Sequence, residues 1–241
     1  MVDVVFHIGA HKCATTSLQI GLRQVSDADP SLAYISPGTR ADAVVAFTAY
    51  MWANRQDKGT QRTIVDKFLT AIAEHEDKAR IIFSNENMLG PMPGMRWKFY
   101  PRAPIVREIL EQVAQRYPTS VFLQSRETAS FLRSCYQFRV KSGMSMSYLQ
   151  FLERFALKSA RWERLGKILF DSAPYKWSVM PIEHLKSPEH AESVQERIRF
   201  LAPGWDLEKR PMPATNSAVP PLARAAAVVL RRAGFELSIA K

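Results

Sequence analysis

Cysteines and long apolar runs are both scarce in this 241-residue sequence. The two cysteines, Cys13 and Cys135, are too few for a disulfide scaffold or a cysteine-based zinc site. No apolar run approaches the roughly 18 residues of a membrane span, and residues 1–6 lack the basic region and cleavage site of a signal peptide. We therefore expect a cytoplasmic protein with no membrane span.

Acidic residues are outnumbered by basic ones. The sequence has 33 Lys and Arg against 23 Asp and Glu, which gives a net charge of +10. Such a surface attracts anions of several kinds: polyphosphates, acidic glycans, nucleic acid or a membrane face. The basic residues are scattered along the chain, and no nucleic-acid-binding motif is recognised among them. We therefore expect an anionic ligand and no nucleic-acid partner.

Segments with the periods of strands and helices alternate along most of the chain. With 46% hydrophobic residues, the chain is long enough to form one α/β domain over residues 1–241. Strands are predicted at residues 2–9, 79–84, 120–125 and 177–180, and helices at residues 15–25, 61–76, from 104 onward, 128–141, 147–157, 160–170, 191–201 and 222–233. This order predicts a three-layer sandwich with a central, mainly parallel sheet flanked by helices, and ligands at the carboxyl ends of the strands.

Residues 9–17 connect the first predicted strand to the first predicted helix. A loop in this position presents backbone N–H groups and the positive end of a helix dipole to an anion. Lys12 adds a full positive charge, and Thr15, Thr16 and Ser17 add hydroxyl donors. The alternative is an ordinary helix start with a solvated lysine, but the position directly after a buried strand favours an anion site. The fold class that we expect is thus a P-loop-type α/β sandwich.

The residue after Lys12 distinguishes between two kinds of phosphate loop. A Walker A loop has a serine or threonine directly after its lysine, and this hydroxyl binds Mg²⁺. Cys13 occupies that position here, and no strand ends in an apolar-Asp pattern. The sequence therefore favours a metal-independent transfer of an anionic group. A P-loop kinase or nucleoside triphosphatase remains one alternative, and a non-enzymatic binder of acidic polymers is another.

Two motifs resemble those of a known family. Residues 6–19 are similar to the His-Lys-x-Gly-Thr-Thr-Ser loop of bacterial and carbohydrate-type sulfotransferases, which binds the 5'-phosphosulfate of PAPS (3'-phosphoadenosine-5'-phosphosulfate); Ala14 stands where that family usually has glycine. Arg126, followed eight residues later by Ser134, is similar to the pair that binds the 3'-phosphate in that family. Lower-specificity resemblances occur at residues 134–143, 162–165, 181–185 and 216–217. The donor-binding residues that the resemblance implies are His11, Lys12, Cys13, Ala14, Thr15, Thr16, Ser17, Arg126 and Ser134.

The resemblance implies an enzyme that moves a sulfuryl group from PAPS, its co-substrate, to an acceptor hydroxyl on a carbohydrate or glycoconjugate, without a metal. Transfer of this kind has a loose transition state, so the protein mainly positions the reactants and stabilises charge. Lys12 is expected to stabilise the leaving phosphate. Glu86, at the end of the predicted strand 79–84, is the candidate base, with His7 and His11 as rivals. The thiol of Cys13, beside Lys12 at a helix start, is expected to have a lowered pKa.

A loop rich in proline and glycine, residues 90–101, follows Glu86 and mixes cations with aromatic rings. Within it, Arg96, Trp97 and Lys98 are candidates for stacking on a sugar ring and attracting an acidic acceptor. The alternative is a loop that only packs across the edge of the sheet. Neither the identity of the acceptor nor the oligomeric state follows from the sequence.

Overall fold

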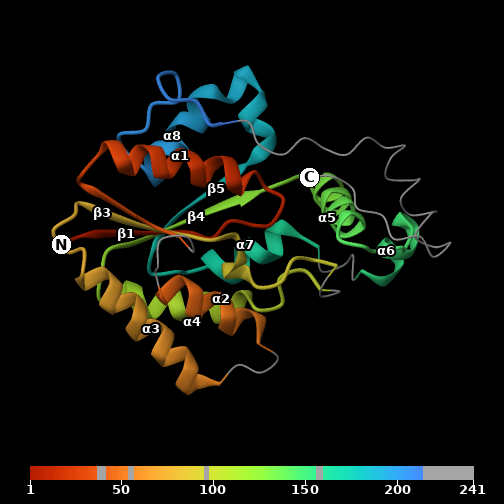
Figure 1. Ribbon diagram of the computed structural model, residues 1–241, viewed down its shortest axis with the longest axis horizontal. Coiled ribbons are helices and arrows are strands. Elements are labelled where there is room, and N and C mark those ends of the chain that lie inside the picture. Colours follow the sequence, from red (N-terminus) through yellow and green to blue (C-terminus); the bar gives the residue numbers. More distant parts are fainter. Residues whose placement is uncertain (37–41, 54–56, 95–97, 156–159, 214–241) are drawn as a thin grey trace.

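The computed structural model describes residues 1–36, 42–53, 57–94, 98–155 and 160–213 (Figure 1). Its elements in chain order are β1 (Asp3–His7), α1 (Thr15–Ala28), β2 (Leu32–Ile35), α2 (Asp42–Trp52), α3 (Lys58–Ala73), β3 (Arg80–Ser84), the 3₁₀ helix η1 (Glu86–Leu89), α4 (Ala103–Ala114), β4 (Thr119–Ser125), α5 (Thr128–Lys141), α6 (Tyr148–Arg154), α7 (Trp162–Phe170), β5 (Lys176–Pro181), the 3₁₀ helices η3 (Ile182–Lys186) and η4 (Pro188–His190), and α8 (Ala191–Leu201). Among these residues, no helix is long and apolar enough to cross a membrane.

The strands form one five-stranded sheet of order β2-β3-β1-β4-β5, in which every neighbouring pair is parallel. The register places His7 of β1 beside Ser84 of β3 and Phe122 of β4. The chain builds the sheet on one side of β1 first and then on the other, so β1 lies where the strand order reverses. In open parallel sheets, ligands bind at the carboxyl ends of the strands at such a point.

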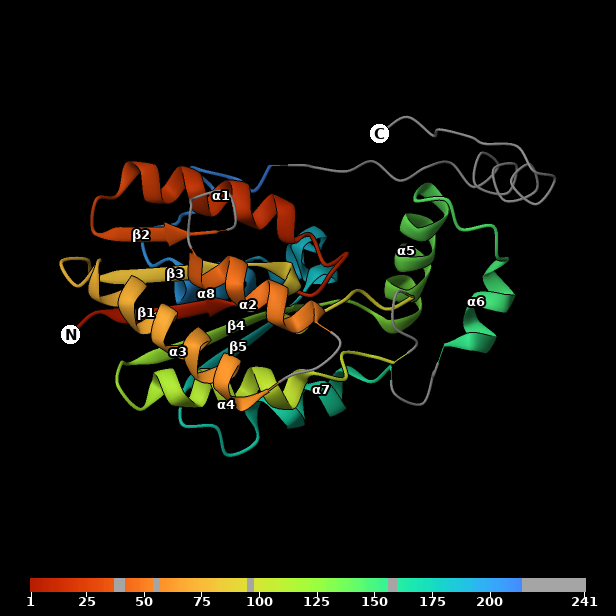
Figure 2. The same cartoon turned by 60° about the horizontal axis from the view of Figure 1, so that its bottom comes forward.

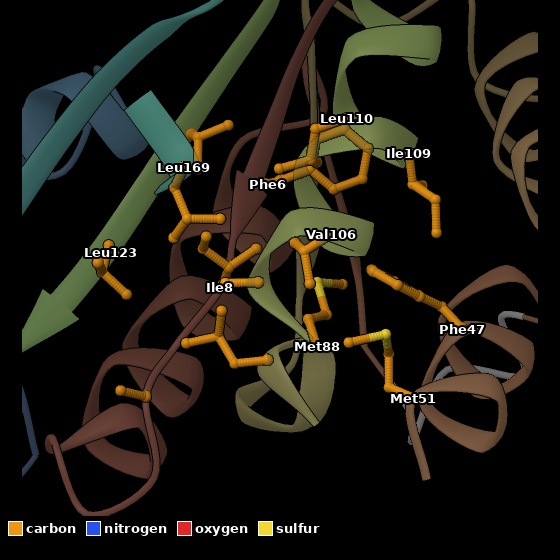
Figure 3. Packing of buried hydrophobic residues seen from close by; sticks show 14 of the residues in the cluster. Phe6, Ile8, Phe47, Met51, Met88, Val106, Ile109, Leu110, Leu123 and Leu169 are labelled. Atoms are coloured by element: carbon orange, nitrogen blue, oxygen red, sulfur yellow. The ribbon is translucent and has the colours of Figure 1, made fainter. Parts of the chain in front are cut away.

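Helices cover both faces of the sheet, which confirms the predicted three-layer arrangement of an α/β sandwich (Figures 1 and 2). Helices α1 and α8 lie on one face, where Leu18 and Ile198 belong to the same buried cluster. Helices α2, α3, α4 and α7 lie on the other face. Figure 3 shows this second core, in which Phe6 of β1, Val106 of α4 and Leu169 of α7 approach one another.

Helices α5 and α6 extend past the carboxyl ends of the strands and lie beside neither face of the sheet (Figure 2). Glu127 begins α5, because its carboxylate accepts hydrogen bonds from the backbone N–H groups of Ala129 and Ser130. Ser147 and Gln150 form a capping box at the start of α6. These caps set where α5 and α6 begin, and both helices lie beyond the edge of the sheet where parallel α/β folds bind their ligands.

Each strand and helix predicted within the described residues has a counterpart in the structure, with ends that differ by a few residues, and two elements were missed. The strand β2 and the helix α2 were not predicted. The helix predicted at residues 147–157 ends earlier, at Arg154, where Phe155 takes an extended conformation. The helix predicted at residues 222–233 lies outside the described residues.

Candidate functional site

The ends of three neighbouring strands meet at one edge of the sheet. Residues 9–17 follow β1, Glu86 follows β3 and Arg126 follows β4. The guanidinium of Arg126 donates from Nη1 to the carbonyl oxygen of Lys12 at 3.0 Å and from Nε to Ser130 Oγ at 2.5 Å. Arg126 therefore links the loop after β1 to the first turn of α5.

The loop after β1 takes an unusual backbone path. Lys12 and Ala14 both have left-handed conformations, with φ of 63° and 58°. Gly9 allows the loop to close over its own helix, because a Cβ there would lie 2.3 Å from Thr15 Cγ2. Ala14 is the first capping residue of α1 and has no side-chain hydrogen bond to the helix, so the first amides of α1 have no side-chain cap.

Replacing Ala14 by glycine is expected to raise the free energy of unfolding by about 0.5–1 kcal/mol. An alanine in the left-handed conformation destabilises the folded protein by roughly 1–2 kcal/mol, and glycine would remove this strain. The greater freedom of glycine in the unfolded chain offsets part of the gain in stability. Denaturant unfolding of the Ala14→Gly variant would measure the change. Ala10→Gly, in the same loop but not in a left-handed conformation, is the matched control and should be destabilising. Equal destabilisation by both changes would contradict strain at Ala14.

The side chain of Lys12 runs from the loop towards α5. Its Nζ lies 5.1 Å from the centroid of the Phe138 ring. Burial lowers the pKa of Lys12, and the nearby cations Lys141 and Arg126 lower it further. In the part of the chain that the structure describes, none of these three cations forms an ion pair with a carboxylate. The site thus concentrates positive charge without a counterion among the described residues.

The hydroxyl residues of the loop differ in exposure. Thr15 and Ser17 are buried, whereas Thr16 is exposed. Ser134 is half-buried on α5, one helical turn after Ser130, which contacts Arg126. The two predicted motifs are therefore connected through Arg126, with Ser134 on the adjacent turn of α5.

Cys13 is fully buried, and the prediction of a lowered pKa for its thiol was wrong. Burial raises the pKa of Cys13 well above its usual value, because the thiolate would lose its hydration. Cys135 is buried as well, and burial raises its pKa to about 12. Desolvation therefore outweighs the effects of the helix start and of Lys12, and Cys13 is a small core residue rather than a nucleophile.

His11 is tied to two other segments. Its Nε2 donates to Asn87 Oδ1 at 3.0 Å, and its backbone N–H donates to Tyr100 Oη at 3.1 Å. The same hydroxyl lies 3.3 Å from Nδ1, so it can donate its proton to that nitrogen. Burial lowers the pKa of His11 and favours this neutral form. Both ring nitrogens are engaged in this structure, so His11 joins the loop to η1 and to the segment that precedes α4.

His7 has the environment of a core histidine. It is fully buried, with Nδ1 2.7 Å from Ser84 Oγ and Nε2 3.2 Å from Gln124 Oε1. Burial lowers the pKa of His7 to about 4. An enclosed ring with both nitrogens bonded has no access to a substrate proton, which leaves Glu86 as the better-placed candidate base.

The lowered pKa of His7 predicts a loss of stability in mild acid. An unfolded histidine titrates near pH 6.5, so between pH 6.5 and 4 the unfolded chain takes up a proton that folded His7 does not. The stabilising contribution is therefore present above pH 6.5 and is lost as the pH falls towards 4. Linkage predicts a loss of about 2 kcal/mol from His7 between pH 7 and 5.

Urea unfolding at pH 7 and pH 5 would measure this contribution. His7→Gln should reduce the difference in unfolding free energy between the two pH values. His75→Gln, which replaces a half-buried histidine, is the control and should leave that difference unchanged. The same pH dependence in all three proteins would show that His7 does not cause it.

Glu86 is the first residue of η1 and lies beside the start of α1. Its Oε2 accepts a hydrogen bond from Nε2 of Gln19 at 3.1 Å, and its side chain is half-buried. Asn85 precedes it and caps η1 by accepting from the backbone N–H of Asn87. Gln19 thus orients a carboxylate next to the loop after β1, a contact over 67 residues that no local sequence pattern indicates.

The loop after η1 has a role that the sequence did not reveal. Arg96 and Trp97 lie outside the described residues, and Lys98 is exposed. Phe99 and Tyr100 are instead buried. The ring of Phe99 packs edge-on against Phe131 of α5 and Trp162 of α7, with centroid distances of 5.6 and 4.9 Å. This end of the loop packs into the core and carries the hydroxyl that holds His11.

No protein-family model matches the chain, and its sequence has no match among curated proteins. Within the described residues, no group of three or more His, Cys, Asp or Glu side chains is arranged to hold a metal ion. The function is therefore inferred from the site itself.

Proposed function

We propose that this protein is a sulfotransferase that moves a sulfuryl group from PAPS to a hydroxyl of a carbohydrate or glycoconjugate. One observation carries this proposal: Arg126 donates a hydrogen bond to the carbonyl of Lys12, 114 residues earlier in the chain. The two segments that resemble the donor-binding motifs of that family are thus in contact, which supports a single donor site. Their positions after β1 and β4, at the reversal of strand order, are where a parallel sheet binds a nucleotide.

The charge of the site suits this donor. PAPS carries negative charge at its phosphosulfate and at its 3'-phosphate, and the donor motifs supply Lys12 and Arg126 with no carboxylate paired to them within the described residues. The uncapped first amides of α1 add further donors beside Lys12. A dianionic ligand group would satisfy both sets of donors.

The proposed reaction assigns a task to each group. The acceptor oxygen forms a bond to sulfur while the bond from sulfur to the 5'-phosphate oxygen breaks, which leaves PAP (3'-phosphoadenosine-5'-phosphate) and a sulfate ester. Lys12 stabilises the negative charge that develops on the phosphate. Glu86, oriented by Gln19, takes the proton of the acceptor hydroxyl. Arg126 and Ser134 hold the 3'-phosphate.

Thermal unfolding with and without PAP tests the proposal. At a PAP concentration about 100 times its dissociation constant, binding would stabilise the protein by about 2.7 kcal/mol and raise the Tm by about 5 °C or more. Arg126→Ala should remove most of this shift. Arg133→Ala is the matched control, because Arg133 is an exposed arginine nearby on α5, and it should retain the shift.

The same experiment distinguishes the alternatives. A larger Tm shift with Mg-ATP than with PAP would favour a kinase or nucleoside triphosphatase. Stabilisation by neither nucleotide, together with salt-dependent binding of a sulfated polymer, would favour a non-enzymatic binder of acidic polymers. Either result would overturn the proposal.

A further inference from the structure

One side of α5 extends the charged site away from Arg126. Ser134, Phe138 and Lys141 are spaced four and three residues apart, which places them on the same side of the helix. The ammonium of Lys12 lies over the ring of Phe138 at 5.1 Å, so this side faces the loop after β1. Phe138 is 42% exposed, which is high for a phenylalanine beside a charged site. The ring therefore has surface left for a ligand.

Lys141 adds a cation that the donor-binding motifs do not include. It is half-buried at the last position of α5 and lies close enough to Lys12 for the two charges to repel. Among the described residues, Lys141 has no carboxylate partner. Unpaired like charges at close range cost free energy that a bound anion would recover.

Lys12 divides the site into two halves. Its main chain contacts Arg126, which precedes α5, whereas its ammonium reaches Phe138 in the last turn of the helix. If Lys12 stabilises the leaving phosphate, the donor extends towards Arg126, and an in-line attack requires the acceptor to approach from a different direction. Phe138 and Lys141 follow Ser134 along α5, away from Arg126, and the Phe138 ring lies beside the Lys12 ammonium.

We infer that the side of α5 formed by Phe138 and Lys141 binds the acceptor, and that the acceptor is an anionic alcohol: a sugar-like ring that carries a carboxylate or sulfate. This inference rests on the proposed function. The ring of Phe138 offers an apolar face on which a sugar ring packs, and Lys141 pairs with the anionic substituent. Glu86 and Lys141 then act on different parts of one acceptor, its hydroxyl and its charged group.

Two probes that differ in one substituent test this inference. In the presence of saturating PAP, binding of 4-nitrophenyl β-D-glucuronide and of 4-nitrophenyl β-D-glucoside is measured by isothermal titration. The protein should bind the glucuronide about tenfold more tightly, as expected for a charge-assisted hydrogen bond. The preference should shrink as the salt concentration rises.

Variants assign the preference to its residues. The Lys141→Gln variant should bind the two probes equally. Arg133→Gln, which removes an exposed cation elsewhere on α5, should keep the preference for the glucuronide. Phe138→Leu should weaken the binding of both probes to the same extent. PAP should bind all of these variants as it binds the unchanged protein, since none of the three residues belongs to the donor motifs.

The outcomes separate this inference from the proposal beneath it. If PAP binds but the glucuronide is not preferred, or if Lys141→Gln keeps the preference, the inference on the acceptor is wrong and the donor assignment stands. If PAP does not stabilise the unchanged protein, the proposed function fails and the acceptor inference fails with it.

Discussion

Lys12→Ala is expected to lower the rate of sulfuryl transfer by about 10²–10³-fold, the usual cost of removing one group that stabilises developing charge in a transition state. The ammonium of Lys12 is held near α5 at 5.1 Å from Phe138, and no described carboxylate neutralises it. The measurement is the release of PAP from PAPS in the presence of an acceptor.

A matched control separates this effect from a general change in charge. Lys176→Ala removes an exposed lysine at the start of β5 and should leave the rate unchanged. Lys12→Ala should still show a Tm shift with PAP, smaller than that of the unchanged protein, because Arg126 and the amides of α1 remain. A rate within a few-fold of the unchanged protein would mean that another group stabilises the leaving phosphate.

Glu86→Gln is expected to keep PAP binding and to lower turnover by about 10²–10⁴-fold, the usual contribution of a general base. Glutamine has nearly the same size as glutamate but cannot accept a proton at neutral pH. Turnover and the PAP-induced Tm shift, measured on the same preparation, would distinguish the loss of a base from a damaged donor site.

Gln19→Ala provides a graded comparison for this prediction. It removes the hydrogen bond to Glu86 at 3.1 Å but leaves the carboxylate in place, so a smaller loss of turnover is expected. If Glu86→Gln retained full activity, Glu86 would not be the base. One of the rival histidines, His7 or His11, would then have to take the proton.

Much of the fold could be predicted because the inner strands carry their own signal. The strands β1, β3 and β4 are continuous buried runs, and each is followed by a helix or a turn residue. The strand β2 is different, with four residues at the edge of the sheet. A run of four residues is too short to give a clear strand pattern in the sequence. The helix α2 was missed because its residues are apolar around much of its circumference, without a clear helical period.

The candidate site could be predicted where it depends on consecutive residues and not where it depends on tertiary contacts. The motifs around Lys12 and Arg126 were found from local spacing. Tyr100 and Gln19 contact His11 and Glu86 over 89 and 67 residues of chain, which no local pattern indicates. The pKa of Cys13 was predicted wrongly because sequence does not tell whether a loop side chain turns into the core, and burial determines the pKa of a thiol in such a place.

The two buried cysteines make the loop after β1 observable by simple chemistry. Cys13 lies within that loop and is 0% exposed, and Cys135 is equally enclosed on α5. Alkylating reagents attack thiolates, so these buried thiols should react slowly in the folded protein. Modification of Cys13 then requires local opening of the loop, and its rate measures how often the loop opens. Any ligand that holds the loop closed should protect this thiol, whatever the chemistry that follows.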